Sequence, residues 1–459
     1  MMTPGRYAKL TKDWLLRGWT DMPRAVVNWT NGDQRQLSKR GLYVAQACDG
    51  ATDFDSVAFL PVHRAFLDKL IEEGIAERCE CGDSIDACQQ YREAENPRLN
   101  GLQWAITGLC NLHCRHCYME APSGRYGEPS FEESLDLIEQ FEQANVHQVS
   151  LTGGEPFVRK DLLDIMEALA QKRICVSQIY TNGLLITEDL LAGVRKIGFS
   201  PVFQISFDGC GAHDYMRGAK AIEGGVIEAI RKVRAADFQV IVATSVDRTT
   251  RDCLPHTYEL LKGLGIQFWR LSPPQERGNW RGAMTGLSLE EEAEAYEPLL
   301  RRWVEDGRPI SLQLGGFFRG AGRDVSVPDQ DPRAQHTPDS YDCGACRETP
   351  CLLPDGTLLP CPGYTDTAVQ DRMPNVLRDG LSKALNQPFL RTMLDMKKGD
   401  LLAENEECAV CEWFAECGMG CRAIALAETG NLMARDPVAC DLWKRGYNRR
   451  FAECTGAAT

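Results

Sequence analysis

From Leu102 onward the chain repeats a strand followed by a helix about every thirty residues. Short runs rich in β-branched and aromatic residues predict strands at 102–107, 146–152, 174–180, 201–207, 238–245 and 266–271. Apolar residues at helical spacing predict helices near 131–144, 160–171, 188–197, 222–236, 252–263 and 288–304. Six such units predict an α/β protein with a parallel, incompletely closed barrel, and the working face of a barrel lies at the C-terminal ends of its strands.

Three cysteines follow the first of these strands, in the stretch LCNLHCRHCY. Three residues separate Cys110 from Cys114, and two separate Cys114 from Cys117. No fourth cysteine follows for more than fifty residues. Three thiolates can therefore hold three corners of an iron-sulfur cube and leave its fourth iron without a protein ligand. The competing interpretation is a zinc ion, with His113 or His116 as the fourth ligand.

The second strand runs into a glycine pair and an acid, because Val149 to Pro156 reads VSLTGGEP. Three cysteines after one strand and GGEP after the next resemble the radical S-adenosylmethionine (SAM) superfamily, and the order and spacing of the two motifs agree. This resemblance implies that a [4Fe-4S] cluster on the three cysteines chelates SAM through its open iron. Cleavage of SAM by one electron would then give a 5′-deoxyadenosyl radical that abstracts hydrogen.

The same resemblance places SAM contacts at the ends of the strands. Missing side chains after the second strand would let the backbone approach the methionine amino group. Ser206 and Asp208, at the end of the fourth strand, match residues that bind the ribose hydroxyls, and Arg217 in HDYMRG matches an arginine that pairs with the SAM carboxylate. The predicted contacts are Gly153, Gly154, Glu155, Asn182, Ser206, Asp208 and Arg217. As alternatives, the glycines are plain turns and Arg217 is a surface residue; His213 is interpreted as structural.

Nine further cysteines gather in the C-terminal part, which is too many for chance. They are Cys343, Cys346, Cys351, Cys361, Cys408, Cys411, Cys417, Cys421 and Cys440. Asp355-Gly356 predicts a hairpin turn between two short apolar strands in the first group. The pattern matches the extension called SPASM, which holds two auxiliary [4Fe-4S] clusters.

By this match the outer cluster is held by Cys408, Cys411, Cys417 and Cys440. Cys421 reaches back to Cys361 and to two of Cys343, Cys346 and Cys351 for the inner cluster. Which of these three thiols is idle, and whether the inner cluster keeps an open iron, stays open at this point. A zinc-ribbon cap is the alternative.

The N-terminal block has its own pattern. Residues 24–30 alternate like an edge strand and precede the tight turn Asn31-Gly32, which predicts a hairpin. Helices are predicted over 37–47 and 62–71. This arrangement is similar to the winged-helix-like element with which many maturases of ribosomally made peptides capture a leader peptide by adding it to a strand edge. A small structural or dimerisation cap is the alternative.

An acidic segment up to Pro97 is interpreted as a linker. It contains Cys79, Cys81 and Cys88, which together with Cys48 form a weaker candidate metal group, because Cys-x-Cys is not a common cube spacing. We therefore expect three domains: a leader-recognition domain with its linker at 1–95, a radical SAM partial barrel at 96–314, and a connector with a SPASM domain at 315–459.

The whole chain has 459 residues and a formal net charge of −14. This charge argues against nucleic acid as the main partner, because a phosphate-binding face needs excess Lys and Arg. No signal peptide or membrane-spanning run is recognised, so twenty cysteines favour metal ligation in a reducing cytoplasm.

The combined domains resemble enzymes that crosslink ribosomal peptides. The expected reaction joins a Cys sulfur of a leader-bound precursor peptide to a carbon of another residue as a thioether, with a flavodoxin- or ferredoxin-type reductant. Carbon-carbon crosslinking and epimerisation stay open, since the same radical serves all of them. From another class, the chain would be a non-catalytic iron-sulfur sensor or peptide-delivery scaffold. Sulfatase-maturating enzymes are disfavoured, because Pro362 stands where they carry an acid that serves as base.

Overall fold

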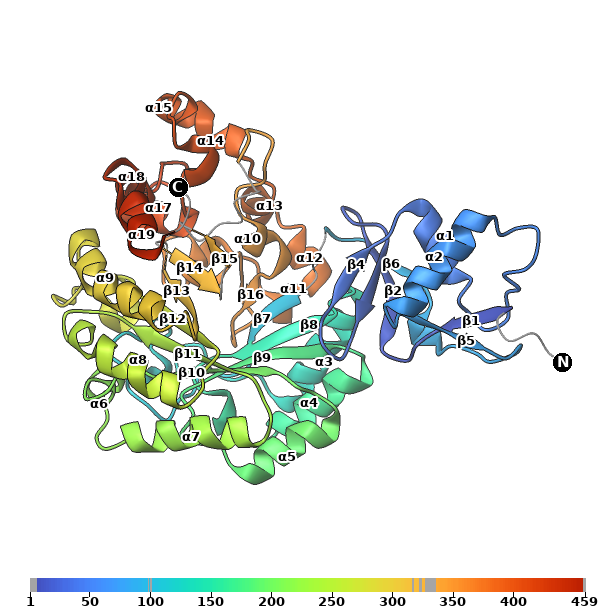
Figure 1. Ribbon diagram of the computed structural model, residues 1–459, viewed down its shortest axis with the longest axis horizontal. Helices are drawn as coiled ribbons and strands as arrows, with labels where there is room; N and C mark the ends of the chain where they lie inside the picture. The colour runs from blue at the N-terminus through green and yellow to red at the C-terminus, as the bar shows by residue number, and fades with distance from the viewer. Residues whose placement is uncertain are drawn as a thin grey trace.

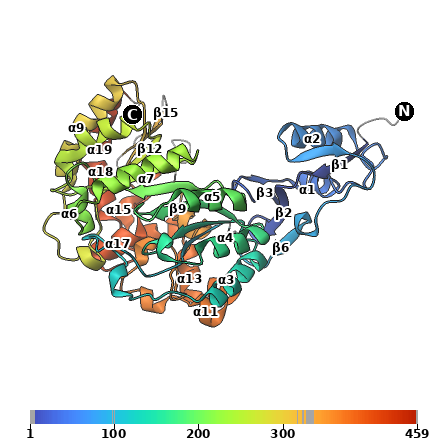
Figure 2. The same ribbon diagram turned by 90° about the horizontal axis from the view of Figure 1, so that it is seen from below.

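The computed structural model describes residues 6–97, 99, 101–315, 318–321, 324–326 and 336–456. A curved central sheet carries helices along its outer side (Figure 1). The C-terminal helices gather on the opposite side of that sheet, and the N-terminal domain projects beyond one end of the barrel, as the turned view also shows (Figure 2). No described helix is both long and apolar enough to cross a membrane.

The barrel contains all six predicted units of strand and helix. Its parallel strands are β7 (Gly101–Ala105), β8 (Gln148–Thr152), β9 (Cys175–Thr181), β10 (Val202–Ser206), β11 (Val240–Ser245), β12 (Phe268–Ser272) and β13 (Ser311–Leu314). The intervening helices are α3 (Phe131–Gln143), α4 (Leu162–Gln171), α5 (Glu188–Ile197), α6 (His213–Arg217), α7 (Glu223–Ala235), α8 (Leu254–Gly263) and α9 (Leu289–Glu305). The predicted partial barrel is confirmed, and the sequence analysis missed only the short α6 and β13.

Side chains of the barrel strands alternate between two environments, because successive residues of a strand point to opposite faces. On β10, Phe203 and Ile205 are fully buried in the core that the helices cover, whereas Gln204 and Ser206 are half-buried on the other face. Polar side chains meet on that second face, where the Gln178 amide donates to Gln204 at 3.0 Å. The inside of the barrel is therefore polar and suited to a ligand.

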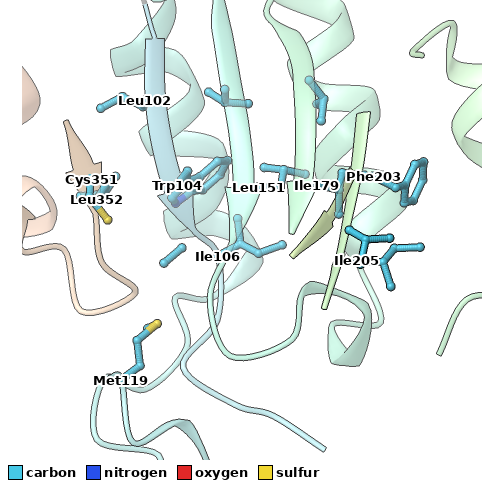
Figure 3. Close-up of a cluster of buried hydrophobic side chains, with 14 of the residues drawn as sticks. Leu102, Trp104, Ile106, Met119, Leu151, Ile179, Phe203, Ile205, Cys351 and Leu352 are labelled. Carbon is cyan, nitrogen blue, oxygen red and sulfur yellow. The ribbon is translucent and has the colours of Figure 1, made fainter. Parts of the chain in front are cut away.

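The core between the sheet and helices is continuous with the C-terminal domain. Trp104 on β7 is fully buried and meets Phe141 of α3 edge-on, with 5.2 Å between the ring centroids. Figure 3 shows the neighbouring strand β16 (Cys351–Leu352), whose Leu352 is the register partner of Trp104. Burying one large apolar side chain contributes about 1.5–3 kcal/mol, so this contact fixes the C-terminal domain to the barrel.

Strands from the C-terminal half extend both edges of the barrel sheet. β16 pairs in parallel with β7 and antiparallel with β17 (Leu358–Leu359), so the hairpin predicted around Asp355-Gly356 is confirmed. At the other edge β14 (Phe318–Ala321) and β15 (Asp324–Ser326) follow β13. Of the predicted connector 315–340, residues 316–317, 322–323 and 327–335 lie outside the described part of the chain.

The N-terminal domain contains two small sheets and two helices. β1 (Tyr7–Leu10) pairs with β5 (Ala76–Cys79), and the second sheet has the order β4 (Gln34–Gln36), β3 (Ala25–Asn28), β2 (Trp14–Trp19) and β6 (Arg92–Ala94). The predicted hairpin is β3–β4, and the predicted helices are α1 (Lys39–Gln46) and α2 (Pro61–Glu72). The expectation that residues 24–30 form an edge strand is wrong, because β3 lies between β4 and β2. The segment expected to be a linker differs, because β6 joins the sheet beside β2 and η1 (Ala87–Gln89) precedes it.

The remaining C-terminal elements are short helices. They are α10 (Gly344–Glu348), α11 (Val376–Asp379), α12 (Leu381–Leu385), α13 (Pro388–Leu394), α14 (Lys398–Glu404), α15 (Glu406–Ala409), α16 (Phe414–Cys417), α17 (Arg422–Thr429), α18 (Pro437–Lys444) and α19 (Tyr447–Thr455). α19 packs on α9 of the barrel, where the Tyr447 hydroxyl and the Glu290 carboxylate are 2.9 Å apart.

Candidate active site

The loop that carries Cys110, Cys114 and Cys117 begins where β7 ends, at the C-terminal face of the barrel. Its ends are fixed by the backbone: the Glu155 N–H donates to the carbonyl of Leu109 (2.9 Å), and the Arg115 N–H donates to that of Met216 on α6 (2.9 Å). The loop is thus held between two barrel connections before any ligand binds.

Each of the three sulfur atoms in this loop accepts a hydrogen bond. Cys110 accepts from the Leu112 N–H at 3.4 Å and Cys117 from the Ala121 N–H at 3.4 Å. Cys114 accepts from Nη1 of Arg217 at 3.8 Å. Burial raises the pKa of Cys110 to about 12, so its thiolate needs a positive partner. Sulfur atoms that receive donors in this way fit thiolate ligands of an iron-sulfur cluster.

The three thiols are not arranged around a single ion. In the described part of the chain, no three His, Cys, Asp or Glu side chains are placed to hold one metal ion. A zinc ion would need each sulfur about 2.3 Å away. The described residues therefore give no support to a single-ion site at this loop, or at Cys48, Cys79, Cys81 and Cys88.

The glycine pair after β8 is required by the cysteine loop. A Cβ atom on Gly154 would lie 2.1 Å from the Leu109 carbonyl oxygen, and one on Gly153, whose φ is +138°, would lie 2.3 Å from that of Thr107. No side chain fits at either position without moving the backbone. These glycines therefore have a structural role besides the predicted contact with the ligand, because they let the backbone of the cysteine loop pack closely against the end of β8.

Glu155 is fully buried and holds two loops together. Its carboxylate accepts hydrogen bonds from the N–H groups of Phe157 (3.2 Å) and Asn182 (2.7 Å) and from the Thr181 hydroxyl (2.8 Å). Burial raises the pKa of Glu155 to about 7 despite these donors. The Asn182 amide in turn donates to Asn111 of the cysteine loop at 2.7 Å. Both predicted residues therefore lie at the site and connect β9 to the cysteine loop.

Asp208 and Arg217 form a buried pair beside Cys114. The guanidinium donates to both carboxylate oxygens, from Nε at 2.6 Å and from Nη2 at 3.0 Å. Burial acts to raise the pKa of Asp208, but the Arg217 guanidinium outweighs it and holds the pKa well below its usual value. Asp208 is thus engaged with protein, whereas Ser206, the other predicted ribose contact, is half-buried at the end of β10. His213 is fully buried and accepts from the Asp208 N–H, as expected for a structural histidine.

The C-terminal cysteines form two groups. Four of them line one cavity together with Trp413 and Trp443: Cys408, Cys411, Cys417 and Cys440. In the second group the Cys346 thiol is hydrogen-bonded to Cys343 and Cys361, contacts that raise its pKa and lower that of Cys361. Cys421 lies close enough to Cys361 for the two to interact electrostatically. Each predicted group therefore converges in space.

Cys351 differs from Cys343 and Cys346 in its place in the fold, although it too lies close enough to Cys361 for the two to interact electrostatically. It lies on β16, is 1% exposed, and is the register partner of Gln103 on β7, so its side chain lies on the face of the sheet opposite to Trp104. Cys343 and Cys346 are instead joined by hydrogen bonds near Cys361. Of the three thiols that the sequence left in competition, Cys351 is the one that the sheet buries.

Comparison with known proteins identifies the central domain. Residues 104–261 match the model of the radical SAM superfamily, and this range contains the cysteine loop, the glycine pair, Glu155 and Arg217. The chain contains a radical SAM domain. It is therefore an enzyme of the radical SAM type, and the radical SAM domain uses SAM and a [4Fe-4S] cluster, for which Cys110, Cys114 and Cys117 are the predicted ligands.

Relatives of the radical SAM domain have several activities. The AdoMet-dependent heme synthase of Oleidesulfovibrio alaskensis is 28% identical over 392 residues, which cover 79% of this chain and 93% of the relative. The mycofactocin maturase MftC of Mycolicibacterium smegmatis is 28% identical over 351 residues, covering 74% and 83%. The crystal structure of Streptococcus suis SuiB bound to precursor peptide SuiA has a TM-score of 0.65 at 14% identity, covering 94% and 99%. At this identity the likeness to SuiB establishes the fold.

The sequence analysis missed one segment of the radical SAM site. The loop after β12 contacts the cysteine loop through Asn279, whose N–H donates to the Cys117 carbonyl (3.0 Å) and whose amide donates to that of Cys114 (3.1 Å). The same loop meets the C-terminal domain, where the Gly278 N–H donates to Asp366 at 3.1 Å. Asn, Gly and Arg in a polar loop carry no recognisable signal, so only the three-dimensional contacts identify this segment.

Proposed function

We propose that this radical SAM enzyme installs an intramolecular crosslink in a ribosomally made precursor peptide, and that the crosslink is a thioether from a Cys sulfur to a carbon of another residue. When bound, SAM supplies the 5′-deoxyadenosyl radical that removes a hydrogen atom from the acceptor carbon. The protein holds the SAM site through Glu155 and Arg217, excludes water and positions the peptide in the polar barrel interior.

The observation that carries this proposal is the extent of the likeness to SuiB. It covers 94% of the chain, so it must include most of the N-terminal domain, which spans about a fifth of the sequence. In that crystal structure SuiB is bound to the precursor peptide SuiA. The likeness to MftC, a maturase, supports a peptide substrate independently.

We also propose that β4 is the strand that captures the leader. Among the described residues, β4 pairs with β3 and lies at an edge of its sheet. The Leu37 N–H donates to the carbonyl of Arg24, so these two residues form a hydrogen-bonded pair of the antiparallel ladder, and Arg35 opposite Val26 forms the next one. Gln36 lies between them in a non-hydrogen-bonded pair, so its N–H points to the open side of β4. An added strand would satisfy such unpaired groups. Beside this edge, Arg35 is paired with Glu73 and stacks on Phe66 at 5.5 Å.

For the C-terminal domain we propose two auxiliary [4Fe-4S] clusters of the SPASM type. The outer one is held by Cys408, Cys411, Cys417 and Cys440, which share one cavity. The inner one is held by Cys343, Cys346, Cys361 and Cys421, with Cys351 idle. A cluster with four protein ligands transfers electrons and leaves no iron for a substrate thiolate. The reductant that serves these clusters is of the flavodoxin or ferredoxin type.

The proposed function is tested with anaerobically reconstituted enzyme, SAM, a reductant and short Cys-containing peptides from reading frames next to the gene. Thioether formation removes two hydrogen atoms from the peptide, which its mass shows. It also consumes one free thiol, and labelling with iodoacetamide counts the free thiols that are left. A product that is two hydrogens lighter but keeps all its thiols would contradict the thioether and indicate a carbon-carbon crosslink. A product whose mass is unchanged in ordinary water, but which gains deuterium in heavy water, would indicate epimerisation. SAM cleavage that no peptide stimulates would contradict a peptide substrate.

The leader site is tested with a matched pair of variants. Gln36→Pro removes the outward N–H of β4 without breaking the ladder to β3, whereas Gln36→Ala removes the same side chain and keeps the N–H. One hydrogen bond contributes about 1 kcal/mol, so Gln36→Pro should weaken peptide binding at least about fivefold and Gln36→Ala should not. Equal affinities in fluorescence anisotropy would refute capture by β4.

A tetrapyrrole is the second candidate substrate, and the likeness to AdoMet-dependent heme synthases favours it. That likeness covers 79% of the chain and leaves unmatched a length similar to the N-terminal domain. Formation of heme from an iron porphyrin in the same assay would support this candidate.

A further inference from the structure

Arg277 is a buried cation with one unused donor. It lies in the loop between β12 and α9 and is 3% exposed. Its Nη2 donates to the carbonyl of Ala423 on α17 at 3.0 Å. Its Nη1 is buried and has no hydrogen-bond partner among the described residues. A side chain from the barrel thus enters the C-terminal domain and leaves an N–H group unsatisfied there.

The unused donor faces the inner group of cysteines. A Cβ atom placed on Gly363 would lie 3.2 Å from Sγ of Cys361 and 3.7 Å from Nη1 of Arg277, so both atoms border the same small space. Burial lowers the pKa of Arg277, and among its neighbours Cys361 and Cys421 oppose that shift most strongly. Asp366, the carboxylate among these neighbours, is already bonded to Arg125 and Arg281.

A buried guanidinium is costly unless negative charge compensates it. Neutral thiols do not provide that charge, but thiolates on an iron-sulfur cluster do. We propose that Arg277 donates a hydrogen bond from Nη1 to a ligand sulfur of the inner auxiliary cluster and raises the reduction potential of that cluster. Hydrogen bonds and positive charge near the sulfurs favour the reduced state, because reduction adds a negative charge. The inference rests on the inner ligand set proposed above.

The same loop links this charge to the SAM site. Two residues after Arg277, Asn279 holds the carbonyls of Cys114 and Cys117. The loop therefore touches the cysteine loop of the SAM site and the inner group of C-terminal cysteines. Arg277 acts on the inner group, whose cluster would accept the electron left after bond formation. Arg277 is a positioning and tuning residue, since it contacts cluster ligands and not the peptide.

The test measures potentials of the full-length, anaerobically reconstituted protein by redox titration with EPR detection. The inner cluster is recognised as the signal that Cys346→Ala lacks. We expect Arg277→Met to lower its midpoint by at least the ~59 mV that corresponds to a tenfold change for one electron. Arg277→Lys, which keeps the charge, should shift it less. Arg281 is a cation of the same loop, but it is bonded to Asp366 and not to a cysteine. Arg281→Met should therefore leave the potential unchanged.

Several results would overturn the inference. One is Arg277→Met with full iron content and an unchanged midpoint; another is an equal shift in Arg281→Met. If Arg277→Met does not fold, Arg277→Gln decides by the same criterion, because it is neutral and retains a donor for Ala423. No peptide is present, so a wrong substrate leaves this result intact. Wild-type protein without iron in the inner group would overturn both the ligand set and the role of Arg277.

Discussion

The buried pair between Asp208 and Arg217 gives the sharpest prediction for the SAM site. Asp208 is fully buried and the Arg217 side chain is 8% exposed. Asp208→Asn keeps the size of the side chain but leaves a buried guanidinium without its counter-charge and places an amide N–H against its donors. Opposite charges about 4 Å apart interact by about 4 kcal/mol at an effective dielectric constant of 20. This agrees with the cost of about 3–5 kcal/mol for removing one partner of a buried pair.

The assay is urea unfolding of the cluster-free protein, followed by tryptophan fluorescence, for Asp208→Asn, Arg217→Met and the double variant. We expect Asp208→Asn to be destabilised by about 3–5 kcal/mol and the double variant by less, because no unpaired charge stays buried. The pKa of Asp208 lies below its ordinary 3.8. The pair therefore stabilises the native state above pH 3.8, and this contribution is lost only as the pH falls through the native pKa.

Glu259→Gln is the control, because Glu259 is an exposed acid paired with Lys262 and Arg302 on the barrel surface, and it should leave the unfolding midpoint unchanged. The reasoning fails if Asp208→Asn unfolds within about 1 kcal/mol of wild type, or if the double variant is less stable than Asp208→Asn. Iron analysis adds a second readout: the variant should also incorporate less iron at the cysteine loop, since Nη1 of Arg217 contacts Cys114.

Three further predictions follow from single positions. Cys346→Ala should lose the iron of one cluster, whereas Cys351→Ala should keep all iron and lose only about 1 kcal/mol of stability, because it truncates a buried side chain. Equal loss of iron in the two variants would contradict the proposed ligand set. Gly154→Ala should reduce iron incorporation and 5′-deoxyadenosine release, while Gly224→Ala, which has open space on α7, should change neither. Burial raises the pKa of Glu292 to about 8, so the free energy of unfolding of the wild type should fall by a few kcal/mol between about pH 4.5 and 8. Glu292→Gln should abolish that fall, and parallel pH profiles of the two proteins would contradict this prediction.

The barrel and the cysteine loop were predictable from the sequence because their signals are local. Strand and helix periodicity is visible within ten to fifteen residues, and it predicted all six units of the barrel. The spacing of Cys110, Cys114 and Cys117 fixes how closely their sulfurs lie in one loop. The turn at Asp355-Gly356 likewise predicted the β16–β17 hairpin from two residues.

Contacts between distant segments needed the tertiary structure. The pairing of β16 with β7 buries Cys351 in the sheet, and Cys346 contacts Cys343 and Cys361; spacing alone indicated neither arrangement. Likewise, nothing in the sequence indicated that Arg277 would enter the C-terminal domain, where it meets Ala423, 146 residues further along the chain. The sequence by itself determined which residues can do chemistry and on which elements they lie. Only the packing of those elements decided which of them meet, because burial and pairing depend on segments hundreds of residues apart.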